Sequence, residues 1–237
     1  MLTFGNRQFR VDGGCPFPEA GSIYVTLCLD MQIFCDFDGT ITNRDSIVFL
    51  TETFGAGEQF RLDILEAIKR GDITVFEAIE RELETVKATW AEAVSALDES
   101  VWIDPDFPAF VTWCSERNFP LSIVSSGMAP VVEHYVGRFG VPVFAHPVTV
   151  DPAGWRYRRD ERNDKKHLLA AASREKPLVF IGDGTSDVSA VPYADILFAR
   201  SGFFLSEHCS RQGIAHYTFT SFREIRKQLD ALLSVEA

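Results

Sequence analysis

A short apolar run that ends abruptly in two carboxylates constrains the fold of this chain more than any other feature. Residues 33–35 read Ile-Phe-Cys, and the sequence Asp36-Phe37-Asp38-Gly39-Thr40 follows directly. This pattern predicts a buried strand that delivers two acids to a glycine-containing loop. Ligands of open α/β sheets bind beyond the carboxyl ends of the strands, so acids there are suited to hold a cation and attack an electrophile. The alternative is a strand followed by an ordinary polar turn.

The composition is that of an ordinary globular protein with a substantial core. The chain has 237 residues, of which 46% are hydrophobic, and its formal net charge is -11. This charge argues against nucleic acid or an anionic membrane as the main partner, because either requires a basic face. The five cysteines are scattered and have no CxxC spacing, which favours a reducing, cytoplasmic location over a disulfide framework or a zinc site: Cys15, Cys28, Cys35, Cys114 and Cys209.

Residues 1–30 fit the rest of the chain poorly and are predicted to be a poorly ordered N-terminal extension. Residues 13–18 are typical of a turn, and the apolar run at residues 23–29 is too short to span a bilayer. No small-residue cleavage site follows, so a signal peptide is not indicated. Met31 stands immediately before the acidic strand, which suggests that translation starts there. The alternative is a genuine edge strand at residues 23–29.

Between residues 45 and 110 the pattern becomes helical. Apolar residues recur at helical spacing over residues 47–68, and Gly71 ends this segment. Thr74, with Glu77 three residues later, forms a capping-box pattern that predicts the start of another helix. A further helix is expected from Thr89. The sequence therefore predicts a helical cap of about 65 residues inserted after the first strand, a size within the lower range of small domains.

The remaining segments, residues 31–44 and 111–237, alternate strands with helices. Beyond the first strand, the expected strands are apolar runs at 120–124, 141–144, 177–181 and 196–199. A turn signal at 151–154 predicts a hairpin, and helices are expected at 130–138, at 165–172, after the Gly-Asp-Gly sequence at 182–184, and at 221–233. This alternation predicts a doubly wound parallel α/β sheet with a Rossmann-type core.

Polar residues follow three of the predicted strands. A parallel sheet gathers the carboxyl ends of its strands at one edge, so these residues are expected to lie together. Lys165 opens the helix that precedes the last of the three strands. Each motif alone has an ordinary structural explanation, but their order is specific: Asp36 and Asp38, then Ser125, Ser126 and Gly127, then Asp183 and Asp187.

In this order the motifs resemble those of the haloacid dehalogenase (HAD) superfamily of phosphohydrolases: DxDGT, a strand-terminal Ser or Thr, a Lys, and GDGxxD. The position of the cap is similar to that in the branch containing phosphoserine phosphatase. Within this branch, residues 36–42, 195–200 and 222–226 resemble the methionine-salvage phosphatases that act on 2-hydroxy-3-keto-5-methylthiopentenyl-1-phosphate. The resemblance implies a Mg²⁺-dependent phosphatase that hydrolyses a small phosphorylated metabolite through an aspartyl-phosphate.

The resemblance also implies a role for each motif residue. Asp36 would attack phosphorus, and Asp38 would protonate the leaving alkoxide and then deprotonate water. Two further groups of residues would hold Mg²⁺ and the phosphoryl oxygens. The metal would be bound by Asp36, Asp38 through its carbonyl, and Asp183, with Asp187 ordering its shell, and the phosphoryl group by Ser125, Ser126, Gly127 and Lys165.

The substrate is left open by the sequence. In the phosphoserine branch a cap acid meets the substrate amine and a cap arginine meets its carboxylate. The first position aligns with Asp45 and the second falls on Glu80, with Arg81 adjacent. An acid where a cation is required argues against phosphoserine as the preferred substrate. The alternatives are a phosphoserine phosphatase, a phosphotransferase with the same motifs, or a non-catalytic binding protein on this fold. A haloacid dehalogenase proper is disfavoured by Asp38 together with Asp183, and the sequence does not predict the oligomeric state.

Overall fold

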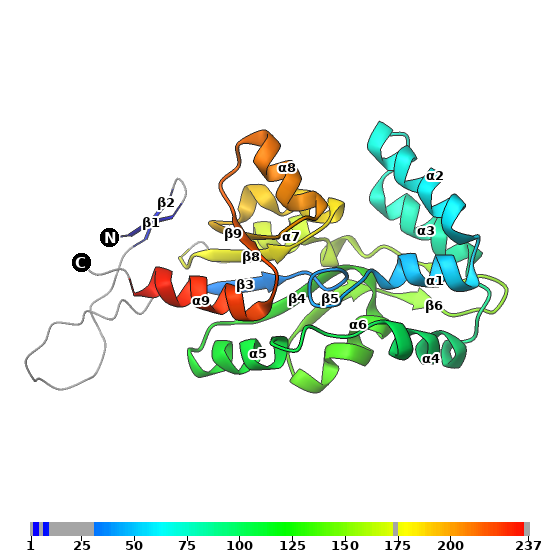
Figure 1. The fold of residues 1–237 in the computed structure, drawn as a ribbon, viewed down its shortest axis with the longest axis horizontal. Coiled ribbons are helices and arrows are strands. Elements are labelled where there is room, and N and C mark those ends of the chain that lie inside the picture. Colours follow the sequence, from blue (N-terminus) through cyan, green and yellow to red (C-terminus); the bar gives the residue numbers. More distant parts are fainter. Residues whose placement is uncertain (1, 5–6, 10–30, 173–174, 235–237) are drawn as a thin grey trace, which may run out of the picture.

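The computed structural model describes residues 2–4, 7–9, 31–172 and 175–234 (Figure 1). Strands β1 (Leu2–Phe4) and β2 (Arg7–Phe9) pair antiparallel as a separate two-stranded sheet. Most of the predicted N-terminal extension, including the edge strand considered at residues 23–29, lies outside the described residues and stays a prediction. None of the described helices is long and apolar enough to cross a membrane.

Parallel strands form a six-stranded core sheet in the order β10-β9-β8-β3-β4-β5. Its members are β3 (Gln32–Cys35), β4 (Leu121–Met128), β5 (Val143–His146), β8 (Leu178–Gly182), β9 (Ile196–Arg200) and β10 (Tyr217–Phe219). The acidic strand β3 is central, with Cys35 beside Ile123 of β4 and Ile181 of β8. This register places the carboxyl ends of β8, β3 and β4 side by side at one edge of the sheet. The predicted parallel α/β fold is confirmed.

Helices cover both faces of the core sheet, which explains why its central strands are apolar throughout. In β8, Leu178 and Phe180 belong to one buried hydrophobic cluster, and Val179 and Ile181 belong to the other. The alternation of side chains along a strand requires this division. Figure 1 shows α7 and α8 on one face and α5 and α6 on the other. These helices are α5 (Phe107–Glu116), α6 (Ala129–Val136), α7 (Lys165–Ala171) and α8 (Phe204–Gln212).

Four further helices form the helical insert, residues 46–100, between β3 and the rest of the core: α1 (Ser46–Phe54), α2 (Gly57–Arg70), α3 (Val75–Thr85) and α4 (Trp90–Ser100). The capping box predicted at Thr74 is present, and Thr89 makes an equivalent one with Glu92. The periodic segment at 47–68 forms two helices rather than one, because Gly55 ends α1 and Gly57, with φ of +83°, opens α2. The described segments of secondary structure in this insert are therefore helices.

Several local expectations differ from the structure. The expected border at residue 110 falls inside α5, which packs on the core helix α9 (Phe222–Leu233) with the Phe110 and Phe222 rings 5.2 Å apart. Residues 125–127 continue β4 instead of following it. The Gly-Asp-Gly sequence leads into a 3-10 helix, Thr185–Ser189, rather than an α-helix. The helix α8 and the strand β10 were not expected.

The remaining elements are short. The expected hairpin is present as β6 (Val148–Thr149) paired antiparallel with β7 (Arg156–Tyr157). Short 3-10 helices also form at Gly137–Phe139, Glu161–Asn163 and Val191–Tyr193. The hairpin lies against the insert, since the backbone N–H of Trp155 donates to the carbonyl oxygen of Leu83 in α3 over 3.1 Å. This contact ties α3 to the hairpin of the core.

Candidate active site

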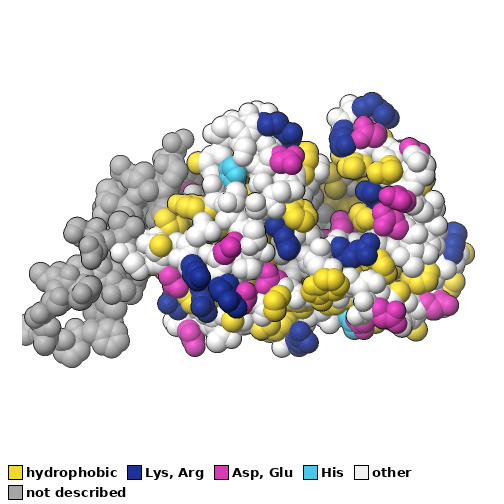
Figure 2. All heavy atoms as spheres, in the orientation of Figure 1, with side chains coloured by type: hydrophobic (Ala, Val, Ile, Leu, Met, Phe, Trp, Pro, Cys, Tyr) yellow, Lys and Arg dark blue, Asp and Glu magenta, His cyan; other side chains and the backbone are white. Residues whose placement is uncertain are grey.

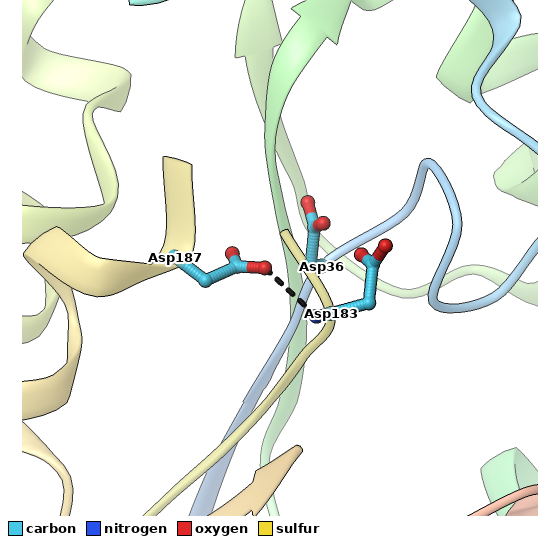
Figure 3. Close-up of side chains that lie close together, drawn as sticks. All are labelled: Asp36, Asp183 and Asp187. Carbon is cyan, nitrogen blue, oxygen red and sulfur yellow. Dashed lines mark hydrogen bonds between the residues drawn. The ribbon is translucent and has the colours of Figure 1, made fainter. Parts of the chain in front are cut away.

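The register of the sheet brings the predicted acids together. Asp36 directly follows β3, and Asp183 directly follows β8. Figure 3 shows the carboxylates of Asp36 and Asp183 close to that of Asp187, which comes from the 3-10 helix after β8. Each of the three side chains offers an oxygen, these oxygens lie within 4.8 Å of one another, and all three residues are buried. Such an oxygen cluster is the donor set that a hard divalent cation prefers.

Lys165, at the start of α7, lies inside this acidic cluster. Its Nζ donates to Asp36 Oδ1 over 2.7 Å, to Asp187 Oδ1 over 2.5 Å and to Ser186 Oγ over 2.9 Å. Burial and the charge of Asp187 raise the pKa of Asp36 to about 7, even though Lys165 opposes this shift. The cluster therefore holds more acidic groups than one ammonium neutralises. Lys166, the neighbouring candidate, is exposed, whereas Lys165 is buried.

Asp187 holds the loop that carries Asp183. Its Oδ2 accepts hydrogen bonds from the backbone N–H of Asp183 over 2.9 Å and of Gly184 over 2.8 Å, the first of which is drawn in Figure 3. The same carboxylate caps the 3-10 helix at its N-terminus. Gly182 is required beside it, because a Cβ there would lie 2.6 Å from the Asp187 carboxyl carbon. The Asp183 carboxylate also accepts a bond from Thr40 Oγ1 over 2.9 Å.

Asp38 faces the strand β4 across the site. Its Oδ1 accepts a hydrogen bond from the backbone N–H of Ser46 over 2.8 Å, and a Cβ at Gly127 would lie 2.6 Å from its Oδ2. Only glycine therefore fits at position 127 with Asp38 in this orientation. Burial and the charge of Asp45 raise the pKa of Asp38 to about 8. The Ser125 hydroxyl accepts a bond from the Gly127 N–H over 2.9 Å, which leaves its own proton available for a ligand.

Arg200, at the end of β9, fixes the loop between Asp38 and the insert. Its Nη1 donates to the carbonyl oxygens of Gly39 over 2.7 Å and of Thr40 and Thr42 over 3.2 Å each. Gly39 has φ of +76°, and a Cβ there would overlap the Asp183 carboxylate. Although residues 195–200 were singled out from the sequence, the individual role of Arg200 was not. A strand-terminal arginine opposite the acidic loop is the signal that could have indicated it.

We expect Arg200→Met to lower the free energy of unfolding by about 2–3 kcal/mol, because hydrogen bonds to a charged group are lost and the loop carbonyls keep no partner of equal strength. Urea denaturation measures this change. Arg223→Met is the matched control, since Arg223 makes an exposed ion pair with Asp106 over 2.9 Å that should contribute less than about 1 kcal/mol. Equal effects of the two substitutions would contradict the role assigned to Arg200.

A cavity of about 190 Å³ lies between these residues and the helical insert. Figure 2 shows the surface hollowed between the insert and the part of the core that carries α8. On the core side the cavity is lined by the predicted catalytic and phosphate-binding residues: Asp36, Asp38, Ser125, Ser126, Gly127 and Asp183. The insert contributes Asp45, Arg61 and Glu82 together with aliphatic side chains. This volume is below the roughly 300 Å³ at which drug-sized ligand pockets begin, so the cavity suits only a small ligand.

The prediction of cap residues needs correction. Glu80 and Arg81 are both exposed, and neither is among the residues that line the cavity. Their place is taken by Glu82, because α3 turns the stripe Val75, Ala78, Ile79 and Glu82 toward the cavity. Asp45 does reach the cavity, but its carboxylate caps α1 by accepting from Ile47 N over 2.8 Å and Val48 N over 3.0 Å. The i, i+3, i+4, i+7 spacing of that stripe is the signal that could have identified Glu82.

We expect Glu82→Gln to stabilise the protein at alkaline pH and not at acidic pH. Burial and the charge of Asp45 raise the pKa of Glu82 to about 8, with Glu52 adding to the shift and Arg61 opposing it. At a pH between the ordinary pKa of a glutamate and about 8, Glu82 is ionised in the unfolded chain but protonated in the folded protein. The free energy of unfolding therefore falls as the pH rises through this range. The gain at pH 8.5 should be on the order of 2 kcal/mol, and absent at pH 4. Thermal melts at the two pH values measure this gain. Glu80→Gln, the same change at an exposed position, is the control and should alter the melting temperature at neither pH.

Comparison with known proteins agrees with this geometry. Residues 33–191 match the family model described as haloacid dehalogenase-like hydrolase. The chain belongs to this family. It is 33% identical over 219 residues to Pdp3-interacting factor 1 of Schizosaccharomyces pombe, covering 85% of this chain and 96% of that one. The polyol phosphate phosphatase PYP1 of Saccharomyces cerevisiae is 29% identical over 227 residues, covering 86% and 94%.

Bacterial relatives and solved structures extend the comparison. A 2-hydroxy-3-keto-5-methylthiopentenyl-1-phosphate phosphatase of Bacillus cereus is 28% identical over 230 residues, covering 88% of this chain and all of that one (100%). A phospho-aspartyl intermediate analogue of phosphoserine phosphatase has a TM-score of 0.65 at 16% identity, covering 84% and 98%. That likeness shows the shared fold. The predicted HAD fold and enzyme class, a HAD-type phosphatase, are confirmed.

Proposed function

We propose that the protein is a Mg²⁺-dependent phosphatase that hydrolyses a small phosphomonoester through an aspartyl-phosphate on Asp36. The observation that carries this proposal is the buried position of Asp36 at the cavity, with Lys165 Nζ 2.7 Å from its Oδ1. This contact orients the carboxylate so that Oδ2 attacks phosphorus. The hydrolysis of the phosphate ester is thereby divided into two displacements, each with a lower barrier than direct attack by water.

Asp38 supplies and removes the proton in the two displacements. When Asp36 attacks phosphorus, the ester P–O bond breaks and the carboxyl proton of Asp38 passes to the leaving alkoxide. Water then attacks the aspartyl-phosphate, gives a proton to Asp38 and releases phosphate together with the Asp36 carboxylate. The Ser125 hydroxyl, the Ser126 and Gly127 backbone and Lys165 hold the phosphoryl oxygens as their charge redistributes.

The residues present fit a magnesium ion. Asp36 and Asp183 would hold it through carboxylates and Asp38 through its carbonyl, with Asp187 ordering the loop that carries Asp183. When bound, Mg²⁺ offsets the repulsion between the carboxylates and a phosphate dianion. The excess of buried acids over the single ammonium of Lys165 supports a divalent cation here.

The substrate class that we propose is a hydroxylated aliphatic phosphomonoester acted on in the cytoplasm. The relatives name two candidates: 2-hydroxy-3-keto-5-methylthiopentenyl-1-phosphate and polyol phosphates. Phosphate release from both, beside phosphoserine and p-nitrophenyl phosphate, tests this proposal. A phosphotransferase would release less inorganic phosphate when an alcohol is added, because the phosphoryl group then passes to the alcohol instead of to water. Failure to hydrolyse p-nitrophenyl phosphate and every metabolite offered would contradict phosphatase function.

Phosphoserine should be a poor substrate. The insert side of the cavity offers the acids Asp45 and Glu82, and its one lining cation, Arg61, already pairs with Glu52 over 2.7 Å. A substrate carboxylate would therefore lack a charge-assisted bond worth about 1.5–3 kcal/mol. We expect kcat/KM for phosphoserine to be about 10- to 100-fold below that for the preferred hydroxylated substrate. A clear preference for phosphoserine would overturn this substrate class.

A further inference from the structure

The strand β4 bulges where it carries Ser125 into the cavity. Val124 of β4 pairs with Phe144 of β5, but the next pair joins Met128 to His146. Residues 125–127 therefore lie opposite a single residue of β5, and the regular ladder between the two strands is interrupted there. Bulges beside active sites re-aim side chains, so the conformation of this one sets the direction of the Ser125 hydroxyl.

Two side chains hold the peptide group between Ser126 and Gly127 inside this bulge. On one side, the Gly127 N–H donates to Ser125 Oγ over 2.9 Å. On the other side, the hydroxyl of Tyr157 in β7 donates to the Ser126 carbonyl oxygen over 2.8 Å, and this bond is buried. A buried carbonyl in an interrupted ladder requires a partner, and Tyr157 supplies it. Rotation of this peptide group would break both bonds together.

The Tyr157 side chain is itself fixed in place. It is 7% exposed, and its ring centroid lies 5.5 Å from that of the fully buried His146. Burial raises the pKa of the Tyr157 hydroxyl, so this group stays protonated and remains a donor near neutral pH. Two residues earlier, Trp155 Nε1 donates to the Ala88 carbonyl oxygen over 2.8 Å, which anchors the hairpin. A donor held this firmly favours one conformation of the bulge.

We propose that Tyr157 is a positioning residue for phosphoryl binding and acts on the substrate through Ser125. This inference rests on the proposed phosphatase function and deepens it. Tyr157 is not among the residues that line the cavity, so its hydroxyl works from behind the bulge. With the peptide group held, the Gly127 N–H stays on Ser125 Oγ and the Ser125 proton is directed to a phosphoryl oxygen. Without the Tyr157 hydroxyl, the peptide group turns more freely and Ser125 loses its fixed direction.

The test measures binding of inorganic phosphate, in the presence of Mg²⁺, from the rise in melting temperature across a phosphate series. Tyr157→Phe removes one hydroxyl group and keeps the ring. We expect it to increase the dissociation constant of phosphate roughly three- to tenfold, the effect of one neutral hydrogen bond. Tyr217→Phe, the same change on a ring of β10 that is 39% exposed, is the control and should leave this constant unchanged. Melts without phosphate report any separate effect on stability.

A double-mutant cycle distinguishes positioning from a general structural effect. Ser125→Ala alone should weaken phosphate binding roughly ten- to hundredfold, because a hydrogen bond to a charged group is lost. In that background Tyr157→Phe should weaken binding no further, since Tyr157 acts through Ser125, whereas independent effects would multiply. An unchanged dissociation constant in Tyr157→Phe, or equal losses in both backgrounds, would overturn the inference. Absence of p-nitrophenyl phosphate hydrolysis by the unaltered protein would instead contradict the phosphatase function, while the phosphate titrations still decide the role of Tyr157.

Discussion

Asp36→Asn is expected to lower turnover at least a hundredfold while the protein stays folded. The amide is nearly isosteric with the carboxylate but is not a nucleophile, so the aspartyl-phosphate does not form. A hundredfold loss corresponds to about 2.7 kcal/mol of activation free energy. Folding should survive because Lys165 keeps Asp187 Oδ1 at 2.5 Å and Ser186 Oγ at 2.9 Å as partners. The substitution therefore separates chemistry from structure.

Steady-state phosphate release and thermal melts of the same preparations measure the two effects of Asp36→Asn. Asp106→Asn is the matched control, because it makes the same chemical change in a surface ion pair with Arg223. It should leave turnover unchanged. Asp36→Asn activity above about a hundredth of the unaltered protein would contradict covalent catalysis by Asp36.

The core part of the site was predictable because a parallel sheet has few ways to arrange its strands. Once β3, β4 and β8 are neighbours, their ends meet at one edge, and Asp36, Ser125 and Asp183 come together without further information. Of the two candidate lysines, Lys165 is buried among these acids and Lys166 is exposed, and the role chosen for Lys165 stays a prediction. The position of each strand end can be read from a short apolar run followed by polar residues, without knowledge of distant contacts.

The insert was less predictable because local signals do not determine how a helix docks. The capping box at Thr74 fixed where α3 begins, but not which of its faces turns toward the core. The contact between Trp155 and Leu83 helps to set that orientation, and it joins residues far apart in sequence. Glu80 and Arg81 were chosen by correspondence with phosphoserine phosphatases, whereas the helical stripe leads to Glu82.

Other differences have similarly specific causes. The helix α8 has only Leu205 and Cys209 as buried apolar residues, which is too few to produce a visible periodicity. The segment after Gly184 looks like a helix start, and the Asp187 carboxylate bonds back to the Asp183 and Gly184 backbone, but the helix that forms is the short 3-10 helix Thr185–Ser189. In both places the hydrophobic pattern alone does not specify the element that forms.

Removal of divalent metal is expected to abolish turnover, and Mg²⁺ is expected to raise the melting temperature. Three buried carboxylates with oxygens within 4.8 Å of one another face one ammonium, Lys165, so the folded site favours a cation and the unfolded chain does not. For a dissociation constant of about 1 mM, 10 mM Mg²⁺ should stabilise the fold by about 1.4 kcal/mol. Phosphate release after chelation and melts across a Mg²⁺ series measure the two effects.

Asp183→Asn separates binding at this site from a general effect of salt. The amide keeps the shape of the side chain and can still accept from Thr40 Oγ1, but it removes one charged ligand, so the Mg²⁺-dependent rise should largely disappear. Equal concentrations of NaCl should not reproduce the rise in the unaltered protein, because screening acts weakly on a buried cluster. Undiminished turnover after exhaustive chelation would refute the metal requirement. A rise that survives in Asp183→Asn would place the stabilising ion elsewhere, since the acids at Asp36 and Asp187 alone are already offset in part by Lys165.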